Sequence, residues 1–272
     1  MRVNEGTGKS SASPPPKEKS LTRPFPISNQ HGTAIKASKV LLVPYEARHV
    51  PKYHSWMQDA AIQEATASEP LTLEEEYENQ QSWRASHDKL TFIVCEPLGA
   101  SSTAPSSTGV KAGVADANDR MRGDVNFFIH LDDQSPGEGD AAESAGETAR
   151  LRGEIDVMVA ERGNWRKGHG SASVRCLLVY IWRNLRGILR EYAAKEGTAA
   201  GGKMVGLMAK IKEGNEGSRG LFGKLGFRQS GEVNYFGEVM MVMSWEEVER
   251  LVEGWMARTE EDMYYEEVKY EL

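Results

Sequence analysis

The sequence has few cysteines and no long hydrophobic run, and these absences exclude several classes of protein. Cys95 and Cys176 are too few for a disulfide-stabilised scaffold. Each lies in an apolar stretch, so we expect buried free thiols in a reducing, cytoplasmic setting. No window approaches the roughly 20 consecutive apolar residues of a membrane helix. The polar N-terminus does not read as a secretory signal, and no membrane partner is expected.

Several motifs of familiar enzyme classes are also missing. His49, His54 and His87 are scattered without the spacing of metal ligands, so no metal site is predicted. The chain has no Gly-x-Ser-x-Gly elbow and no Cys–His pairing that would indicate a covalent nucleophile. The net charge of −7 argues against a nucleic-acid partner.

Charge and composition divide the chain into segments. Residues 1–39 carry seven basic and two acidic residues, whereas residues 244–272 carry ten acidic and three basic ones. Residues 1–38 lack an apolar period and are interpreted as a disordered basic tail. We interpret 245–272 as an acidic C-terminal segment that is partly helical. The segments 97–121 and 131–150 are rich in small residues, which indicates low-complexity insertions into a single domain at 39–244.

Within that domain, strand and helix patterns follow a recognisable order. Apolar or alternating runs predict strands at 39–45, 90–96, 123–130, 153–160, 203–211 and 234–245. Helical spacing predicts helices at 49–62, 70–83, 171–197 and 215–226, with Thr72 and Glu75 as a capping box. Because the strands first follow one another and then alternate with helices, we expect an α/β fold with a mixed central sheet flanked by helices.

The segment GNWRKGHGSASV, residues 163–174, joins a predicted strand to a long predicted helix. Gly168 and Gly170 would let the backbone approach an anion, toward which the unpaired N–H groups of the helix start point. Arg166 and Lys167 add positive charge. The segment matches neither the P-loop nor the Rossmann fingerprint. A phosphate-binding loop and a tight turn before a helix are therefore the two alternatives.

The place of this loop, late in the chain and before NEGSRGLFGKLGF, resembles that of the GNAT acetyltransferases. Their pyrophosphate loop reads Q/R-x-x-G-x-G/A, a pattern that falls here on 165–170, with Trp165 in place of Gln or Arg. Asn215 and Gly226–Phe227 match the downstream unit. The segments TASEPLTLEEEY, GEIDVMVAE and KIKEGNEGSRGLFGKLGF extend the resemblance to the N-acetyltransferase 9-like family over most of 39–243.

The resemblance implies the GNAT fold and an acetyl-CoA-dependent N-acetyltransferase that acts on the N-termini of α- and β-tubulin. It implies that strand backbone and loop residues bind coenzyme A, namely Met158, Val159, Ala160, Trp165, Arg166, Lys167, Gly168, His169, Gly170, Ser171 and Asn215. Plain helix capping is the alternative role for Asn215, and the side chain of His169 is expected to be a bystander.

The catalytic base is expected on the strand that leads into the loop. A protein N-terminus has a pKa of about 7.7 to 8.0, so a modest base or an ordered water suffices. Glu154 and Asp156 share one face of the strand and are the candidates. The alternative is that each is solvated or paired with a lysine. Phe222 stands where many GNAT enzymes place a tyrosine as the acid, and phenylalanine cannot donate a proton.

Two other functions stay open at this point. One is a non-catalytic protein of GNAT fold that binds microtubules through the basic tail. The other is a related acetyltransferase for another protein or a small amine. If tubulin is the acceptor, a carboxylate from Glu69 to Glu76 or from the acidic C-terminal segment is expected to face a cationic residue of the substrate.

Overall fold

The computed structural model describes residues 32–98, 109–132, 149–196, 202–258 and 264–272. Its strands are β1 (Thr33–Ala37), β2 (Leu41–Pro44), β3 (Lys89–Cys95), β4 (Gly109–Lys111), β5 (Met121–Leu131), β6 (Arg150–Val159), β7 (Lys203–Lys212), β8 (Arg228–Ser230), β9 (Glu238–Ser244) and β10 (Tyr265–Glu271). They form one ten-stranded sheet in the order β4-β10-β1-β2-β3-β5-β6-β7-β9-β8. The β6–β7 and β10–β4 pairs are parallel and the others antiparallel, so the sheet is mixed.

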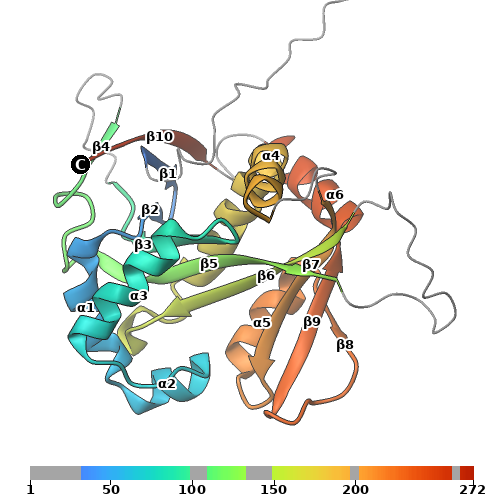
Figure 1. Cartoon of the computed structure of the whole chain (residues 1–272), viewed down its shortest axis with the longest axis horizontal. Coiled ribbons are helices and arrows are strands. Elements are labelled where there is room, and N and C mark those ends of the chain that lie inside the picture. The colour runs from blue at the N-terminus through green and yellow to red at the C-terminus, as the bar shows by residue number, and fades with distance from the viewer. Residues whose placement is uncertain (1–31, 99–108, 133–148, 197–201, 259–263) are drawn as a thin grey trace, which may run out of the picture.

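Helices cover both faces of this sheet (Figure 1). The described helices are α1 (Val50–Met57), α2 (Ala60–Thr66), α3 (Leu73–Ala85), α4 (His169–Glu196), α5 (Glu216–Leu225) and α6 (Trp245–Met256), with short 3-10 helices η2 (Ala47–His49) and η3 (Arg162–Asn164). The α/β fold with a mixed sheet flanked by helices, predicted from the order of the elements, is confirmed.

Each face of the sheet carries its own hydrophobic core. On one face, Leu177 of α4 and Phe222 of α5 belong to the same buried cluster as Ile155 of β6. On the other face, Tyr53 of α1 belongs to a second cluster that includes Met158 of β6. Because side chains alternate along a strand, β6 contributes to both cores, and its even-numbered residues face α1 and α3.

Most of the predicted helices and strands of 39–244 are present. Thr72 and Glu75 exchange hydrogen bonds at the start of α3, which confirms the capping box. The predicted helix at 49–62 is divided into α1 and α2. The division arises because α1 ends at Met57 and Asp59 caps the next helix, its side chain accepting a hydrogen bond from Ala61 N–H.

The two ends of the described chain add strands that the sequence patterns did not indicate. β1 lies within 1–38 and buries Ala34 and Ile35 completely, so the prediction of disorder is wrong for 33–37. It pairs along its length with β10 from the acidic segment 245–272, and Lys36 lies 3.6 Å from Glu266 across the pair. α6 confirms that this segment is partly helical. Residues 1–31 lie outside the described residues.

The described part of the predicted insertion 97–121 is integrated into the fold. Asp116 is buried, and its Oδ2 accepts hydrogen bonds from His49 Nε2, 2.8 Å away, and from the Tyr270 hydroxyl. Burial alone would raise the pKa of Asp116, but these hydrogen bonds outweigh it and lower the pKa to about 2. The carboxylate therefore connects the segment to η2 and to β10. Residues 99–108, and 133–148 of the second insertion, lie outside the described residues.

We expect Tyr270→Phe to destabilise the fold by about 1–3 kcal/mol, because it removes a hydrogen bond from a buried carboxylate. Urea unfolding measures this as a lower midpoint at unchanged slope. Tyr235→Phe is the matched control, since Tyr235 is 97% exposed and its loss of a hydroxyl should cost less than about 0.5 kcal/mol. Equal stability of the two variants would contradict the role of Asp116.

Candidate active site

The sheet opens between β6 and β7. Their parallel pairing stops at Glu154↔Met208, although β6 continues to Val159 and β7 to Lys212. Beyond this fork β6 stays paired with β5, and β7 stays paired with β9. Among the residues that the structure describes, no strand therefore pairs with this edge of β6 over residues 155–159.

Every second residue of β6 turns its backbone groups toward this open edge. Ala160 N–H donates to Arg122 O, so Ala160 and, by alternation, Met158 face β5. Val157 and Val159 face the fork. The prediction that Met158, Val159 and Ala160 all present backbone groups to coenzyme A is therefore corrected, because three consecutive residues of a strand cannot face one side. Val157 was missed.

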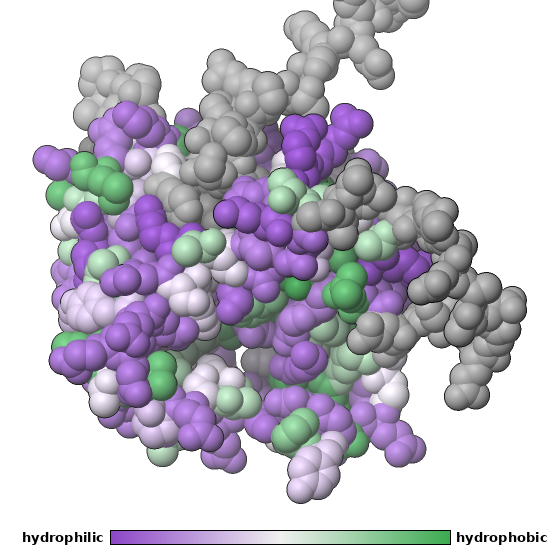
Figure 2. Space-filling model, viewed as in Figure 1, coloured by the Kyte–Doolittle hydropathy of each residue, from purple (hydrophilic) through white to green (hydrophobic). Residues whose placement is uncertain are grey.

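The molecular surface is hollowed at the fork. Figure 2 shows the hollow between the surface over α1–α3 and the surface over α5 and β9. The start of α4 lies at the same place, because a Cβ built on Gly170 would lie 3.0 Å from Leu221 Cδ1 of α5 and 3.7 Å from Val159 Cγ2. An extended ligand on the β6 edge would therefore reach the N-terminus of a 28-residue helix.

The loop before α4 has a backbone shape suited to an anion. Gly168 has φ of 89°, and Arg166 has φ of 60°, both in the left-handed region. Arg166 and Lys167 are exposed, and Ser171 lies in the first turn of α4. The unpaired N–H groups of that turn and the helix dipole favour negative charge at this end.

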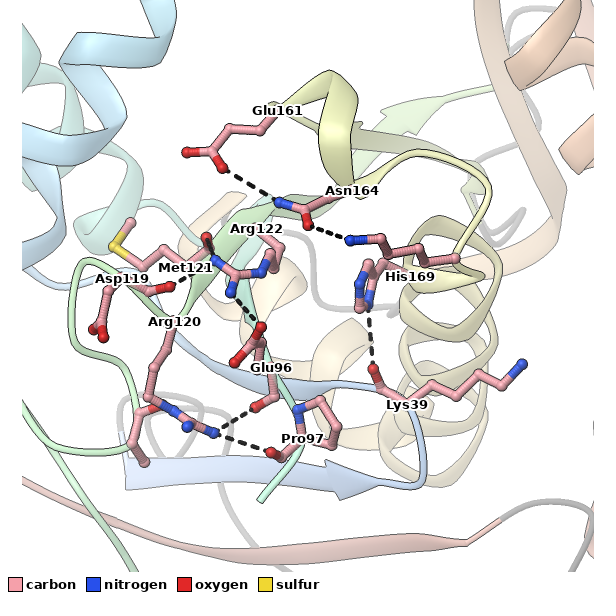
Figure 3. Close-up of polar contacts among 12 residues, drawn as sticks. Lys39, Glu96, Pro97, Asp119, Arg120, Met121, Arg122, Glu161, Asn164 and His169 are labelled. Atoms are coloured by element: carbon pink, nitrogen blue, oxygen red, sulfur yellow. Dashed lines mark hydrogen bonds and ion pairs between the residues drawn. The ribbon is translucent and has the colours of Figure 1, made fainter. Parts of the chain in front are cut away.

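Side-chain hydrogen bonds within this loop and to a neighbouring turn stabilise its conformation (Figure 3). Asn164 Nδ2 donates to Glu161 Oε2, and Lys167 Nζ donates to Asn164 Oδ1, each at 3.3 Å. His169 Nδ1 lies 3.3 Å from the carbonyl oxygen of Lys39 in the turn between β1 and β2. These contacts stabilise the conformation of the loop, and the His169 ring contributes one of them.

Trp165, which departs from the Gln or Arg of the GNAT pattern, reaches back to β6. Its indole Nε1–H donates to Val159 O at 2.7 Å, while 53% of the residue stays exposed. The guanidinium of Arg162 lies 5.8 Å from the centre of the ring. The indole therefore occupies a carbonyl of the open edge.

Two residues of the downstream unit have structural roles in α5. Asn215 caps the helix, with its Oδ1 accepting a hydrogen bond from Ser218 N–H at 3.1 Å. This is the capping alternative, and a contact of Asn215 with coenzyme A stays a prediction. Phe222 is 2% exposed and packs edge-on against Phe227, so it is a core residue.

The two candidate bases have different environments. Glu154 Oε2 lies 2.9 Å from Lys210 Nζ and 3.0 Å from His130 Nε2. Burial alone would raise the pKa of Glu154, but hydrogen bonds from His130 and Lys210 outweigh it and lower the pKa. Glu154 is therefore the lysine-paired carboxylate of the stated alternative, and its role as a base stays a prediction.

Asp156 is placed to accept a proton near neutral pH. It is partly buried on β6, and burial together with the charges of Glu154 and Asp124 raises its pKa to about 7. A general base is most effective when its pKa lies close to the working pH. Of the two candidates, the structure favours Asp156.

The structure adds neighbours that sequence reasoning did not single out. Asp124 and Asn126 lie on β5 opposite Met158 and Asp156, on the same face. Asp124 is buried, accepts hydrogen bonds from Asn126 Nδ2 at 2.8 Å and from Tyr53 Oη at 3.3 Å, and has a pKa raised by burial to about 6. The sequence did contain a signal for these two residues, because Asp124 and Asn126 are polar residues two positions apart in the otherwise apolar strand 123–130.

Within the described ranges, no group of three or more His, Cys, Asp or Glu side chains is placed to hold a metal ion. No helix among the described residues is long and apolar enough to span a membrane. That the protein uses no metal and has no membrane or nucleic-acid partner stays a prediction.

Comparison with known proteins agrees with this geometry. A family model described as "Acetyltransferase (GNAT) domain" matches residues 39–228. An N-acetyltransferase 9-like protein of Schizosaccharomyces pombe is 35% identical over 216 residues, which are 76% of this chain and 94% of the relative. The chain belongs to the N-acetyltransferase 9-like family of GNAT acetyltransferases. The family resemblance and the acetyltransferase activity expected from it are thereby confirmed.

Relatives in this N-acetyltransferase 9-like family include proteins with more specific names. Human "Alpha/beta-tubulin-N-acetyltransferase 9" is 35% identical over 219 residues, covering 80% of this chain and 86% of the relative. Among solved structures, spermidine N-acetyltransferase from Vibrio cholerae, in complex with CoA and spermine, matches with a TM-score of 0.51. It covers 78% of this chain and 98% of its own, at 12% identity, and this likeness shows the fold alone.

We expect the kcat/KM of acetyl transfer to rise with pH around a midpoint near 7, because Asp156 accepts a proton only as the carboxylate. Asp156→Asn should lower kcat/KM by about 10²- to 10⁴-fold at pH 8. Glu154→Gln should move the midpoint to lower pH, since the charge of Glu154 raises the pKa of Asp156. Rate profiles between pH 5.5 and 9 measure both effects, and an unmoved midpoint in Glu154→Gln would contradict the assignment.

We expect Gly168→Ala to weaken acetyl-CoA binding about tenfold in calorimetric titration. Alanine costs about 1–2 kcal/mol in the left-handed conformation of this residue, so the loop relaxes away from its anion-binding shape. Gly163→Ala in the same loop is the control, because no atom lies within 4 Å of its Cβ position. Equal affinities of the two variants would show that the loop does not bind the ligand.

Proposed function

We propose that this acetyltransferase transfers the acetyl group of acetyl-CoA to the N-terminal amine of a protein, with α- and β-tubulin as acceptors. The observation that carries the proposal is the position of Asp156, with a pKa of about 7, on the strand that forms one side of the fork. A protein N-terminus, with a pKa of about 7.7 to 8.0, is the amine that such a carboxylate can deprotonate at neutral pH.

The residues at the fork fit acetyl-CoA. The backbone of Val157 and Val159 faces the open edge of β6, which suits an amide-bearing pantetheine arm. Gly168 and Gly170, Arg166, Lys167 and the start of α4 suit a pyrophosphate. When bound, acetyl-CoA supplies the activated thioester. Ser171 and Asn215 lie at the starts of α4 and α5, and their contacts with this ligand are part of the proposal.

The protein's own groups then determine the proton transfer. Asp156 takes a proton from the acceptor ammonium, which leaves a neutral amine able to attack. Burial, followed by the charges of Glu154 and Asp124, keeps the pKa of Asp156 high, although Lys210 and His130 lower it. N–H groups of β6 that face the fork are positioned to donate to negative charge that develops on a carbonyl oxygen there.

The tubulin acceptor is supported by the names of the relatives, among them human "Alpha/beta-tubulin-N-acetyltransferase 9". We further propose that the protein acts in the cytoplasm. Cys95 and Cys176 are both buried free thiols, which supports a reducing compartment.

The proposal is tested with peptides that carry the first ten residues of α- or β-tubulin and one internal lysine. Mass spectrometry after incubation with acetyl-CoA should locate the new acetyl group on the N-terminal amine. The same peptide with a formylated N-terminus should stay unmodified, and Asp156→Asn should remove most of the product. Acetylation of the internal lysine, or of spermine in preference to both peptides, would contradict the proposal.

A further inference from the structure

Helix α3 buries two polar residues, one turn apart, where a helix of this kind normally buries apolar ones. Glu76 and Gln80 are each 2% exposed. Gln80 has a clear structural role, because its Nε2 donates to Tyr45 O at 2.8 Å. Among the described residues, no side chain or backbone group forms a hydrogen bond or ion pair with the carboxylate of Glu76.

Tyr45 presents a second unpaired group at the same place. It is 5% exposed, and among the described residues its hydroxyl has no hydrogen-bond partner. Its ring lies 5.2 Å from that of Tyr53, whose hydroxyl donates to Asp124. Burial, followed by the charges of Glu76 and Asp124, raises the pKa of Tyr45, so its hydroxyl lies within the field of both carboxyl groups.

This cluster is continuous with the base at the fork. Asp124 lies close enough to both Tyr45 and Asp156 to act on them electrostatically, because its charge contributes to the raised pKa of each. Tyr45 and Asp124 lie on the side of the sheet that α1 and α3 cover, and Glu76 is a buried residue of α3 on that side. An acceptor whose amine lies at Asp156 would place its first side chains on this side.

The chemistry of the unpaired groups defines the ligand. Burial raises the pKa of Glu76, and a cation with N–H donors would stabilise its ionised form. His54 on α1 attracts Glu76 electrostatically but forms no hydrogen bond with it in the described structure. A guanidinium has several donors in one plane and could bond the carboxylate and the hydroxyl together.

We propose that Glu76 and Tyr45 form a subsite that binds the cationic side chain of the acceptor's first or second residue. This subsite rests on the proposed function and deepens it. The acceptor would be selected by the positive charge of its first or second side chain as well as by its N-terminal amine. Asp124, held by Tyr53 and Asn126, links this subsite to Asp156.

The experiment separates binding from transfer. Peptides of sequence Met-Arg-Ala-Ala-Gly-Ser, and the same with citrulline in place of arginine, carry fluorescein at the C-terminus. Citrulline keeps the shape of arginine without its charge. Fluorescence anisotropy gives Kd for each peptide with the full chain in the presence of saturating CoA, and acetyl-CoA turnover on the same peptides gives kcat/KM.

The wild-type protein should bind the arginine peptide at least tenfold more tightly than the citrulline peptide. Glu76→Gln should reduce this ratio to within twofold, and Tyr45→Phe should reduce it partly. Glu78→Gln on the exposed face of α3 should leave it unchanged. Thermal unfolding of each variant checks that it is folded.

Equal Kd values for the two peptides, an equal loss in Glu78→Gln, or no measurable binding of either peptide would overturn the subsite. Failure of the proposed function gives a different result, because peptides that bind with the expected preference would then receive no acetyl group. The ratio of the two Kd values therefore tests the subsite, and kcat/KM on the same peptides tests acetyl transfer.

Discussion

The separation of β6 from β7 after Glu154↔Met208 is the constraint on which the rest of the site depends. Two parallel strands that stayed paired would satisfy one another's backbone groups and leave no edge for a ligand. Because they separate, the start of α4 can lie against the fork, and Val157 and Val159 turn their backbone groups toward it. The ion pair between Glu154 and Lys210 joins the strands at the last point where they are close.

The electrostatics of the site follow from that position. Lys210 and His130 lower the pKa of Glu154, and burial, followed by the charges of Glu154 and Asp124, keeps the pKa of Asp156 near neutral. Two carboxylates on one strand face, two residues apart, thereby have different protonation behaviour. Asp124 lies on the same sheet face as Asp156, and Tyr45 and Glu76 of helix α3 lie on that side of the sheet, so the proposed base and the proposed cation subsite share one polar layer.

The parts of the fold that could be predicted from the sequence are those with strong local patterns. The capping box at Thr72, the long helix α4 and the glycine loop all have signals within a few residues of one another. β1 and β10 were missed because each is stabilised by pairing with a segment more than 200 residues away, which no local pattern records. The burial of Asp116 depends likewise on His49 and Tyr270. At the site, the strand and the loop lie where the sequence patterns predicted them. The different environments of Glu154 and Asp156 could be recognised only once the position of Lys210 was known.

Amide hydrogen exchange tests the central claim, that the open edge of β6 holds acetyl-CoA, most directly. Mass spectrometry of peptides that cover 153–160 and 163–174 would be compared with and without saturating acetyl-CoA, alongside a peptide from α6 as reference. The account predicts slower exchange in 155–159 and in the loop around Gly168, with α6 unchanged. Saturable binding that leaves exchange in 155–159 unaltered would contradict it, because the ligand would then lie elsewhere.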